Sequence, residues 1–318
     1  MSVVTFRNNV RVGYQKSAIT YKDTIGTFSM KPRIKAEMAD YSFEVYACHK
    51  TDSVLMVRRY EVVAGDFYVI SGQSNAAATV FGAWSSKYAR TIARTPDNDP
   101  SITPRDTNWT LAAWSWTYVG AWGLEMQKEI LERDSIPTCV INGSLPGKKL
   151  SEFLSRDPRD STSFSLYGGL VKRVRVANPA RIRAFIWMHG EQEVFENIGN
   201  YAQEYDQLYK FWAHDYPEVE QFVVVQSNLI ILRNDTPNPV GGSVRDFLRR
   251  TKYLYPKTDH FAAIGTPDYD GVHYHRSGYE EFGRRMYRFF SHGIYGSKDT
   301  DNVWSPDIKK AFYNNAEK

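Results

Sequence analysis

The sequence predicts an α/β fold in which helices cover both faces of a parallel sheet, preceded by a small β segment, and three observations support this prediction. From Asp66 onward, short apolar runs alternate with longer stretches of helical periodicity. Several of these apolar runs end in polar loops that contain glycine, which is typical of strands at the ligand-binding edge of an open sheet. Residues 1–64 instead contain short apolar or alternating runs joined by turns. Strands that alternate with helices build right-handed βαβ units, whereas the N-terminal runs predict a small antiparallel β segment.

The composition is that of a globular protein without a strong charge bias. The 318 residues are 42% hydrophobic and 24% charged, with 40 lysines and arginines against 36 aspartates and glutamates. This balance, together with the lack of a basic run interleaved with aromatic residues, argues against a nucleic-acid partner. No run of 18 apolar residues occurs, so the sequence predicts no membrane-spanning helix and no membrane partner.

The cysteines and the first residues bear on the compartment. Cys48 and Cys139 each lie in or beside an apolar, strand-like run, which predicts two free buried thiols rather than a disulfide. Residues 1–25 carry charged side chains without an apolar core, so no signal peptide is visible. The cytoplasm stays open as the location, and a secreted or periplasmic protein, with its signal peptide absent from this sequence, is the favoured expectation.

The elements follow in order along the chain. Residues 1–64 are expected to form strands at 3–6, 43–47 and 54–57, and the tail 294–318 is mostly polar. Between them, residues 65–293 are the predicted α/β domain, with a long loop over 90–110 that is rich in Thr, Asp, Asn and Pro. The other runs predict strands at 67–70, 138–142, 182–188, 221–226 and 261–264 and helices at 114–133, 166–177, 201–214, 244–255 and 277–290.

The stretch that ends in Gly72-Gln73-Ser74-Asn75 contains the candidate nucleophile. The aromatic and β-branched run before it predicts a buried strand, and Gly72 then permits a sharp turn. Ser74 follows at the carboxyl end of that strand, where ligands collect in open α/β sheets. The same tetrapeptide is also ordinary turn and helix-capping chemistry. A plain turn therefore stays open unless a base and a carboxylate occur in a matching context.

A base and a carboxylate do occur in loops that a parallel sheet brings to one edge. Loops 143–147 and 189–191 follow predicted strands, as Ser74 does, and Asp270 and His273 lie between the last strand and the last helix. A serine nucleophile needs an imidazole to take its proton, a carboxylate to orient the imidazole, and N–H groups to hold the oxyanion. Asp270 and His273 have the spacing for the carboxylate and the base. A turn aspartate and a surface histidine are the alternatives, and His275 is a competing base.

These motifs together are similar to those of the SGNH hydrolases, and more narrowly to the sialate O-acetylesterase and acetylxylan esterase branch, over roughly residues 64–292. The resemblance implies a flavodoxin-like three-layer α/β/α fold, no metal or other cofactor, and deacetylation of carbohydrate through an acyl-serine. It assigns Ser74 as the nucleophile, His273 as the base and Asp270 as its orienting carboxylate. The motifs that carry it are Gly72-Gln73-Ser74-Asn75, the Ser-x-x-Gly loop at 144–147, the Trp-x-x-Gly-Glu loop at 187–191, Asp270-Gly271-Val272-His273, Gly278-Tyr279 and Gly283-Arg284-Arg285-Met286.

Two departures from the family pattern concern the expected oxyanion hole. Pro146 replaces one of the glycines usual in the second loop, and proline has no N–H to donate. The N–H groups of Ser74 and Gly147 are then the expected donors. His189 stands where the branch tends to have glutamine and is a further candidate donor, although a structural pair with Glu191 that braces the loop is an equal alternative. The supporting residues expected around the nucleophile are Gln73, Asn75 and Glu191.

The predicted function is a serine carbohydrate esterase that removes O-acetyl groups from sialic acid or from a plant or bacterial polysaccharide. The aromatic-rich stretch from Trp84 to Trp116, which includes Trp109, is expected to face the sugar. A non-catalytic carbohydrate-binding protein on the same fold stays open as an alternative. A metal-dependent hydrolase is the other alternative, and it would draw its ligands from the acidic and histidine residues of the loops, namely His189, Glu191, Asp270, His273 and His275.

Overall fold

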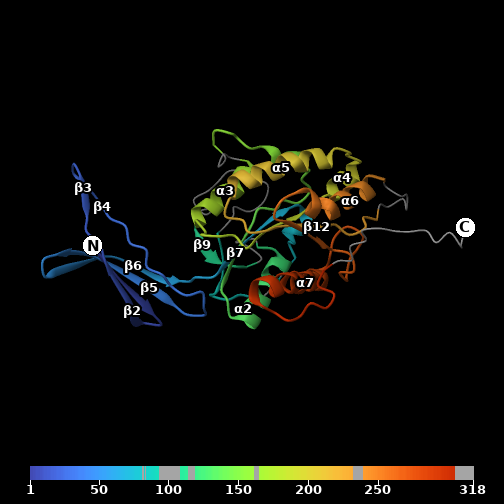
Figure 1. Ribbon diagram of the computed structural model, residues 1–318. Coiled ribbons are helices and arrows are strands. Elements are labelled where there is room, and N and C mark those ends of the chain that lie inside the picture. The colour runs from blue at the N-terminus through green and yellow to red at the C-terminus, as the bar shows by residue number, and fades with distance from the viewer. Residues whose placement is uncertain are drawn as a thin grey trace, which may run out of the picture.

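The computed structural model describes residues 1–80, 82, 84–92, 108–113, 119–160, 165–231 and 239–304. Small antiparallel sheets make up the N-terminal part, and a large sheet flanked by helices makes up the rest (Figure 1). This is the predicted combination of an α/β fold with an N-terminal β segment.

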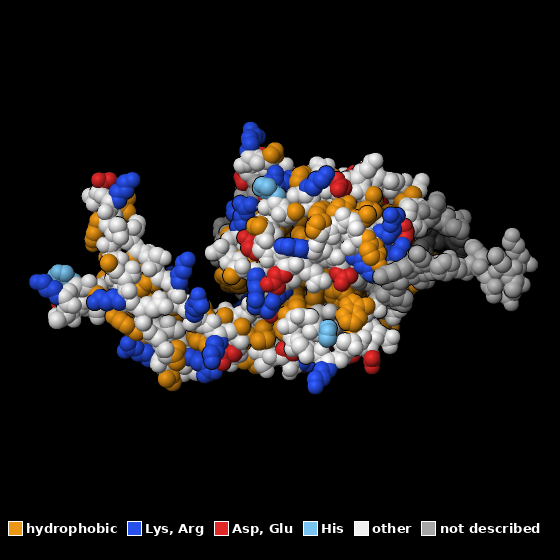
Figure 2. All heavy atoms as spheres, viewed as in Figure 1, with side chains coloured by type: hydrophobic (Ala, Val, Ile, Leu, Met, Phe, Trp, Pro, Cys, Tyr) orange, Lys and Arg blue, Asp and Glu red, His pale blue; other side chains and the backbone are white. Residues whose placement is uncertain are grey.

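The N-terminal part consists of a four-stranded antiparallel sheet and a hairpin. The sheet has the order β2-β1-β5-β6, and β3 pairs with β4. Residues 1–64 contain ten lysines and arginines against six aspartates and glutamates, so this part carries the whole formal charge excess of +4 (Figure 2). The bounds are β1 Ser2–Arg7, β2 Val10–Lys16, β3 Thr20–Lys22, β4 Ile25–Thr27, β5 Tyr41–His49 and β6 Asp52–Val62.

The large sheet has the flavodoxin-like strand order. Its seven strands run β13-β12-β11-β7-β10-β8-β9, and all pairs are parallel except β8 with β9. Counted from β7 and without β8 and β9, the order is 2-1-3-4-5, which reverses direction between β7 and β11 and places the ligand-binding crevice there. The bounds are β7 Asp66–Gly72, β8 Ala89–Ile92, β9 Trp109–Leu111, β10 Thr138–Asn142, β11 Ala184–Met188, β12 Phe222–Gln226 and β13 Thr258–Ala262.

Helices cover both faces of this sheet, so the central strands are buried on both sides. One face packs on α2 (Ala121–Asp134) and α7 (Arg276–Tyr295), through side chains such as Trp122 and Phe282. The other face packs on α3 (Leu166–Ala177), α5 (Tyr201–Asp215) and α6 (Pro239–Leu254), as Figure 1 shows. The short elements at the loops are α1 (Ser74–Ala77), α4 (Glu191–Glu196) and the 3-10 helix η2 (Leu150–Leu154).

Several predicted boundaries were wrong. The stretch expected to be a loop over 90–110 overlaps β8 and the edge strand β9, with residues 93–107 outside the described part. The helix expected from 114 begins at Ala121, because Gly120 has φ +88° and cannot continue a helix; residues 114–118 are not described. The last helix extends to Tyr295, into the expected tail, of which 305–318 are not described.

The two cysteines are free, as predicted, with Cys139 buried and Cys48 half-buried. None of the helices in the described ranges is long and apolar enough to cross a membrane.

Candidate active site

The loops after the three central strands meet at one edge of the sheet. β7 lies between β10 and β11 in parallel register with both, so the three carboxyl ends coincide. Hydrogen bonds continue past the strand ends: Leu145 N–H donates to the Gly72 carbonyl (3.0 Å), and Gln73 N–H donates to the Met188 carbonyl (3.1 Å). The predicted meeting of these loops is therefore confirmed.

Gly72 makes the turn that brings the candidate nucleophile to this edge. Its φ of +139° is a conformation that side chains rarely adopt, and a Cβ built there would lie 1.9 Å from the Met188 carbonyl oxygen. The chain can pass this closely to β11 only because residue 72 has no side chain. Helix α1 begins two residues later, with Ser74 as its first residue.

The Ser74 hydroxyl meets the imidazole of His273. Ser74 Oγ lies 2.9 Å from His273 Nε2, although 199 positions separate the two residues in the chain. When Nε2 is unprotonated, the imidazole accepts the hydroxyl hydrogen, which is the geometry that a general base requires. Ser74 is half-buried and His273 is exposed, so the pair is open to a ligand. The competing base His275 occupies the N-cap position of α7, and within the described ranges Ser74 Oγ bonds to His273 alone.

Asp270 binds the backbone of the His273 loop rather than its ring. The carboxylate accepts hydrogen bonds from the N–H groups of Val272 (2.8 Å) and His273 (2.7 Å). Desolvation raises the pKa of Asp270, but these two N–H donors outweigh it and hold the pKa below its ordinary value. No hydrogen bond joins the carboxylate to the His273 ring in the described structure, which differs from the predicted orientation of the imidazole. Asp270 therefore fixes the loop and places a negative charge near the base.

Asn75 connects the nucleophile turn to three other parts of the site. Its Nδ2 donates to Glu191 Oε1 (2.8 Å) and to the Val272 carbonyl (2.9 Å), and its Oδ1 accepts from the Tyr279 hydroxyl (2.9 Å). Its backbone carbonyl accepts from Trp122 Nε1 (3.0 Å). Asn75 is 1% exposed, so these bonds form in a buried environment where leaving any partner unpaired is costly. Asn75 thus holds the Ser74 turn and the His273 loop in one arrangement.

Gln73 and Glu191 are both buried beside this network. Gln73 Oε1 accepts from the N–H groups of Gly190 (3.4 Å) and Gln192 (3.3 Å), which ties the nucleophile turn to the start of α4. Burial raises the pKa of Glu191, even though the Asn75 amide donates to it. The structure therefore brings the predicted supporting residues together across the switch between β7 and β11.

The backbone N–H groups of Ser74 and Gly147, the expected oxyanion donors, have no acceptor in the described structure. Gly147 lies in an exposed turn with φ +69° and open space on its Cβ side. Two other N–H groups of the same loop are engaged, since Ser144 donates to Asn142 Oδ1 (2.8 Å) and Leu145 to the Gly72 carbonyl. Ser74 and Gly147 thus retain the donors that an oxyanion needs.

His189 is buried and directs its ring away from an oxyanion role. Its Nε2 lies 2.9 Å from the Lys148 carbonyl oxygen, so Nε2 carries the hydrogen and donates it there. Burial lowers the pKa of His189 to about 4, which keeps the ring neutral at pH 7. The ring stacks on Trp187, and Nδ1 lies 3.5 Å from Glu193 Oε2. The contact with Lys148 agrees with the alternative of a loop-bracing residue, but Nδ1 has no hydrogen-bond partner among the described residues, so the expected pair with Glu191 does not form.

Three residues of the site were missed in the sequence. Trp122 and Tyr279 bind Asn75 from the two helices on one face of the sheet. Asn142 Nδ2 donates to the carbonyls of Ala76 (3.0 Å) and Val119 (2.8 Å), which joins the end of β10 to the nucleophile turn. Tyr279 belongs to a motif of the resemblance, whereas the other two carry no sequence signal of their own.

The aromatic stretch that was expected to face the sugar does not bring Trp109 beside Ser74 in the described structure. Trp109 is on the edge strand β9, which β10 and β8 separate from β7, and Trp116 is not among the described residues. Across the ranges that the structure covers, no three His, Cys, Asp or Glu side chains come together as ligands for a metal ion.

Comparison with known proteins identifies the family. A family model described as "Carbohydrate esterase, sialic acid-specific acetylesterase" matches residues 64–292. XAC1771, a carbohydrate acetylesterase from Xanthomonas citri, has a similar structure, with a TM-score of 0.61 and 15% identity over 94% of this chain and 70% of its own. A protein from Arabidopsis thaliana has a TM-score of 0.50 and 18% identity over 69% of this chain and 94% of its own. At these identities the two structures support the fold alone.

No curated protein matches the chain. The family model covers more than half of the sequence and includes every element of the site described above. The chain therefore belongs to the carbohydrate esterase family of sialic acid-specific acetylesterases, and it is a carboxylic ester hydrolase.

Proposed function

We propose that the protein removes O-acetyl groups from a carbohydrate through an acetyl-serine formed on Ser74. The observation that carries the proposal is the 2.9 Å contact between Ser74 Oγ and His273 Nε2. His273 takes the hydroxyl proton as Oγ attacks the acetyl carbonyl, and the N–H groups of Ser74 and Gly147 stabilise the oxyanion. His273 then gives the proton to the departing sugar oxygen, and it activates the water that releases acetate.

Asp270 supports this cycle through charge and loop geometry. The lowered pKa of its carboxyl keeps it ionised at neutral pH, which favours the imidazolium that forms on His273 during each step. Its hydrogen bonds to the N–H groups of Val272 and His273 hold the backbone that carries the base. Asp270 is in this role a positioning residue for His273.

The substrate class follows from the family and from the openness of the site. The family description names sialic acid, and O-acetylated sialic acid is therefore the first candidate substrate. Because His273 is exposed and Ser74 is half-buried, the site has room for an acetyl ester that is carried on the outside of a larger carbohydrate. The acyl group is proposed to be acetyl.

Hydrolysis of 4-nitrophenyl acetate by Ser74→Ala and wild-type protein tests the mechanism. Loss of the nucleophile is expected to lower kcat/KM by at least about 10³-fold with the fold intact, because little catalysis remains without it. Ser243→Ala, a serine in α6 whose hydroxyl binds only its own helix, is the matched control and should keep the wild-type rate. Near-wild-type activity in Ser74→Ala would overturn the assignment. Inactivation of the wild type by a chelator would favour a metal-dependent hydrolase instead.

The substrate is tested with natural esters. Acetate release from O-acetylated sialic acid and from acetylated xylan oligomers is compared at equal ester concentration, and aryl butyrate serves as the longer acyl control. Release from sialic acid with little activity on butyrate is expected. Release from xylan alone would move the protein to the polysaccharide branch. Sugar binding without any acetate release would support a non-catalytic binding protein.

A further inference from the structure

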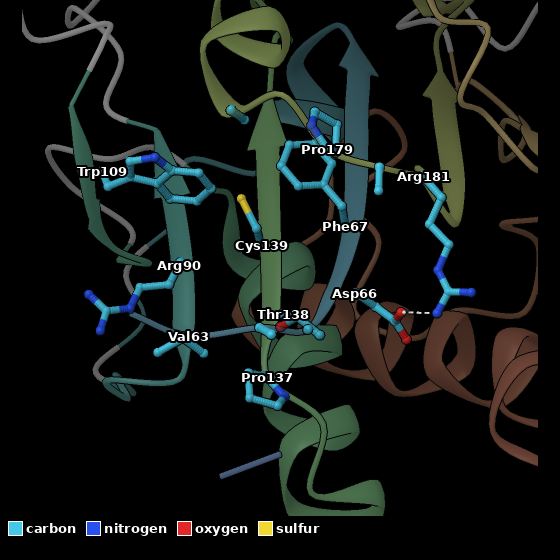
Figure 3. A pocket seen from close by; sticks show the side chains of 14 residues that line it. Val63, Asp66, Phe67, Arg90, Trp109, Pro137, Thr138, Cys139, Pro179 and Arg181 are labelled. Carbon is cyan, nitrogen blue, oxygen red and sulfur yellow. Dashed lines mark hydrogen bonds and ion pairs between the residues drawn. The ribbon is translucent and has the colours of Figure 1, made fainter. Parts of the chain in front are cut away.

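A second candidate site lies on the face of the sheet that packs on α3, and Figure 3 shows the side chains that line it. It is a cavity of about 550 Å³, within the range of sites that hold small molecules. Phe67 in its wall precedes Gly72 by five residues of extended strand, or about 16 Å at 3.3 Å per residue. The cavity is therefore separate from the catalytic pair. Its lining includes Phe67, Arg90, Trp109, Cys139, Pro179 and Arg181.

The cavity exists because α3 ends before it covers the strands beneath. The helix stops at Ala177, Asn178 follows in the left-handed conformation, and Pro179 directs the chain away. The sheet register places Arg90 beside Cys139 and Trp109 beside Ile92, so Arg90 and Trp109 lie on the same face. Figure 3 shows Cys139 between Trp109 and Phe67. In the described part of the chain, this face thus has aromatic side chains on both sides of Cys139.

The charge of the lining is positive. Arg90 forms no ion pair in the described structure: its Nε is buried without a hydrogen-bond partner, and one terminal nitrogen lies 3.4 Å from the Glu61 carbonyl. Arg181 lies 3.5 Å from Asp66, but Asp66 also binds Arg183 at 2.8 Å, so one carboxylate serves two guanidinium groups. Arg90 is therefore free to bind an anion, and carboxylate is the anion that guanidinium matches in geometry.

The apolar part of the lining favours a ligand that contains a ring with an apolar face. Trp109 is 51% exposed, so its indole offers an open face, and Phe67 and Pro179 supply apolar contact on the other side. Burial raises the pKa of the Cys139 thiol, which leaves it neutral and unable to repel an anion. A ligand that satisfies both parts has a ring with an apolar face and a carboxylate at its edge.

We propose that this cavity is a non-catalytic binding site for a carboxylated sugar residue of a polysaccharide, with Trp109 stacking on the ring and Arg90 binding the carboxylate. The inference goes beyond the proposed acetylesterase function and does not depend on Ser74. A second site on the same chain would hold an acidic glycan while another part of it reaches the catalytic serine. Multivalent contact of this kind raises apparent affinity for a polymer without new chemistry.

Isothermal titration calorimetry with defined sugars tests the site. Glucuronic acid and N-acetylneuraminic acid are the acidic probes, and glucose is the neutral counterpart of the first. The titrations use the full chain carrying Ser74→Ala, with and without Trp109→Ala or Arg90→Gln. Trp304→Ala, which removes a tryptophan that is 49% exposed, and Arg250→Gln, which removes an arginine whose side chain is 55% exposed, are the matched controls.

At least one acidic sugar is expected to bind at least about tenfold more tightly than glucose, because glucose has no carboxylate and cannot form the charge-assisted bond with Arg90. Trp109→Ala and Arg90→Gln should each weaken the binding of that acidic sugar by about tenfold or more, whereas the two control variants should weaken it by less than twofold. Binding of glucuronic acid alone identifies a uronic acid polymer, and binding of N-acetylneuraminic acid alone a sialylated glycan. Equal binding of glucose, or no effect of Arg90→Gln, would overturn the proposal. If Trp109→Ala does not fold, Arg90→Gln decides.

Hydrolysis of 4-nitrophenyl acetate separates this proposal from the catalytic one. Trp109→Ala and Arg90→Gln, placed in a chain with Ser74 intact, should keep the wild-type rate on this small ester. A loss of that rate in both variants would show that they disturb the fold of the catalytic part, and it would overturn the assignment of a separate site.

Discussion

Asn75→Asp keeps the size of a buried side chain but converts its amide donor into an acceptor. The new oxygen would face Glu191 Oε1 at 2.8 Å and the Val272 carbonyl at 2.9 Å, where Asn75 now donates two hydrogen bonds. A neutral hydrogen bond is worth about 1 kcal/mol and a charged one up to about 3 kcal/mol, and buried acceptors that face each other add repulsion. The expected loss of unfolding free energy at pH 7 is about 3–5 kcal/mol. Activity should fall as well, because Val272 adjoins the base.

Urea unfolding of Asn75→Asp at pH 7 and pH 5, with aryl acetate hydrolysis, measures both effects. Burial raises the pKa of Glu191 above its ordinary 4.5, so proton uptake on lowering the pH restores a donor and shrinks the deficit of the variant. Glu191→Gln keeps the acceptor for Asn75 and should cost less than about 1 kcal/mol. Combined with Asn75→Asp, it supplies a new donor and should recover at least about 1.5 kcal/mol. A deficit below about 1 kcal/mol at pH 7, or strictly additive losses, would refute this reasoning.

Three further predictions concern the rest of the site. Gly72→Ala forces a Cβ to 1.9 Å from a backbone oxygen at φ +139°, so thermal unfolding should show a loss above about 3 kcal/mol, whereas Gly199→Ala, with no atom within 4 Å, should be mild. Asp270→Asn keeps the acceptor oxygen but removes the charge, so kcat/KM should fall about 10–100-fold, against at least about 10³-fold for His273→Ala; equal losses would contradict the positioning role. His189 has a folded pKa of about 4 against an ordinary 6.5, so the wild type loses stability as pH falls through this window, by up to roughly 3 kcal/mol relative to His189→Gln. Urea unfolding at pH 7 and pH 4.5 checks this, and a pH-independent difference would contradict it.

The parallel sheet could be predicted because its central strands are continuous apolar runs. Strands buried on both faces are typical of parallel sheets that helices cover on each side, and residues 138–142 and 184–188 are buried in this way. The helices between the strands then fix the topology. The short strands β8 and β9 at one end of the sheet could not be found in this way. They have only four and three residues, and the stretch between them is rich in Thr, Asp, Asn and Pro, which is typical of a loop. Their place in the sheet is set by the pairing of β10 with β8 and of β8 with β9.

The sequence motifs were enough to predict which residues form the candidate site, but not all of the contacts between them. Ser74 and His273 meet because parallel strands bring their loops to one edge, which the order of elements already implies. The partners of the Asp270 carboxylate were not predictable, because a spacing of three residues fits a bond to the His273 ring and a bond to its backbone equally well. The role of Asn75 also required the structure, since Trp122 and Tyr279 reach it from helices that are distant in sequence.

Covalent labelling with a fluorophosphonate, followed by mass spectrometry of the digested protein, tests the proposed nucleophile most directly. The reagent reacts only with a serine that a neighbouring base activates, as the 2.9 Å contact with His273 provides. The label should map to the peptide that contains Ser74, disappear in Ser74→Ala, and fall strongly in His273→Ala. Labelling of a different residue, or hydrolysis of aryl acetates by a protein that takes up no label, would contradict the assignment of Ser74 as the catalytic nucleophile.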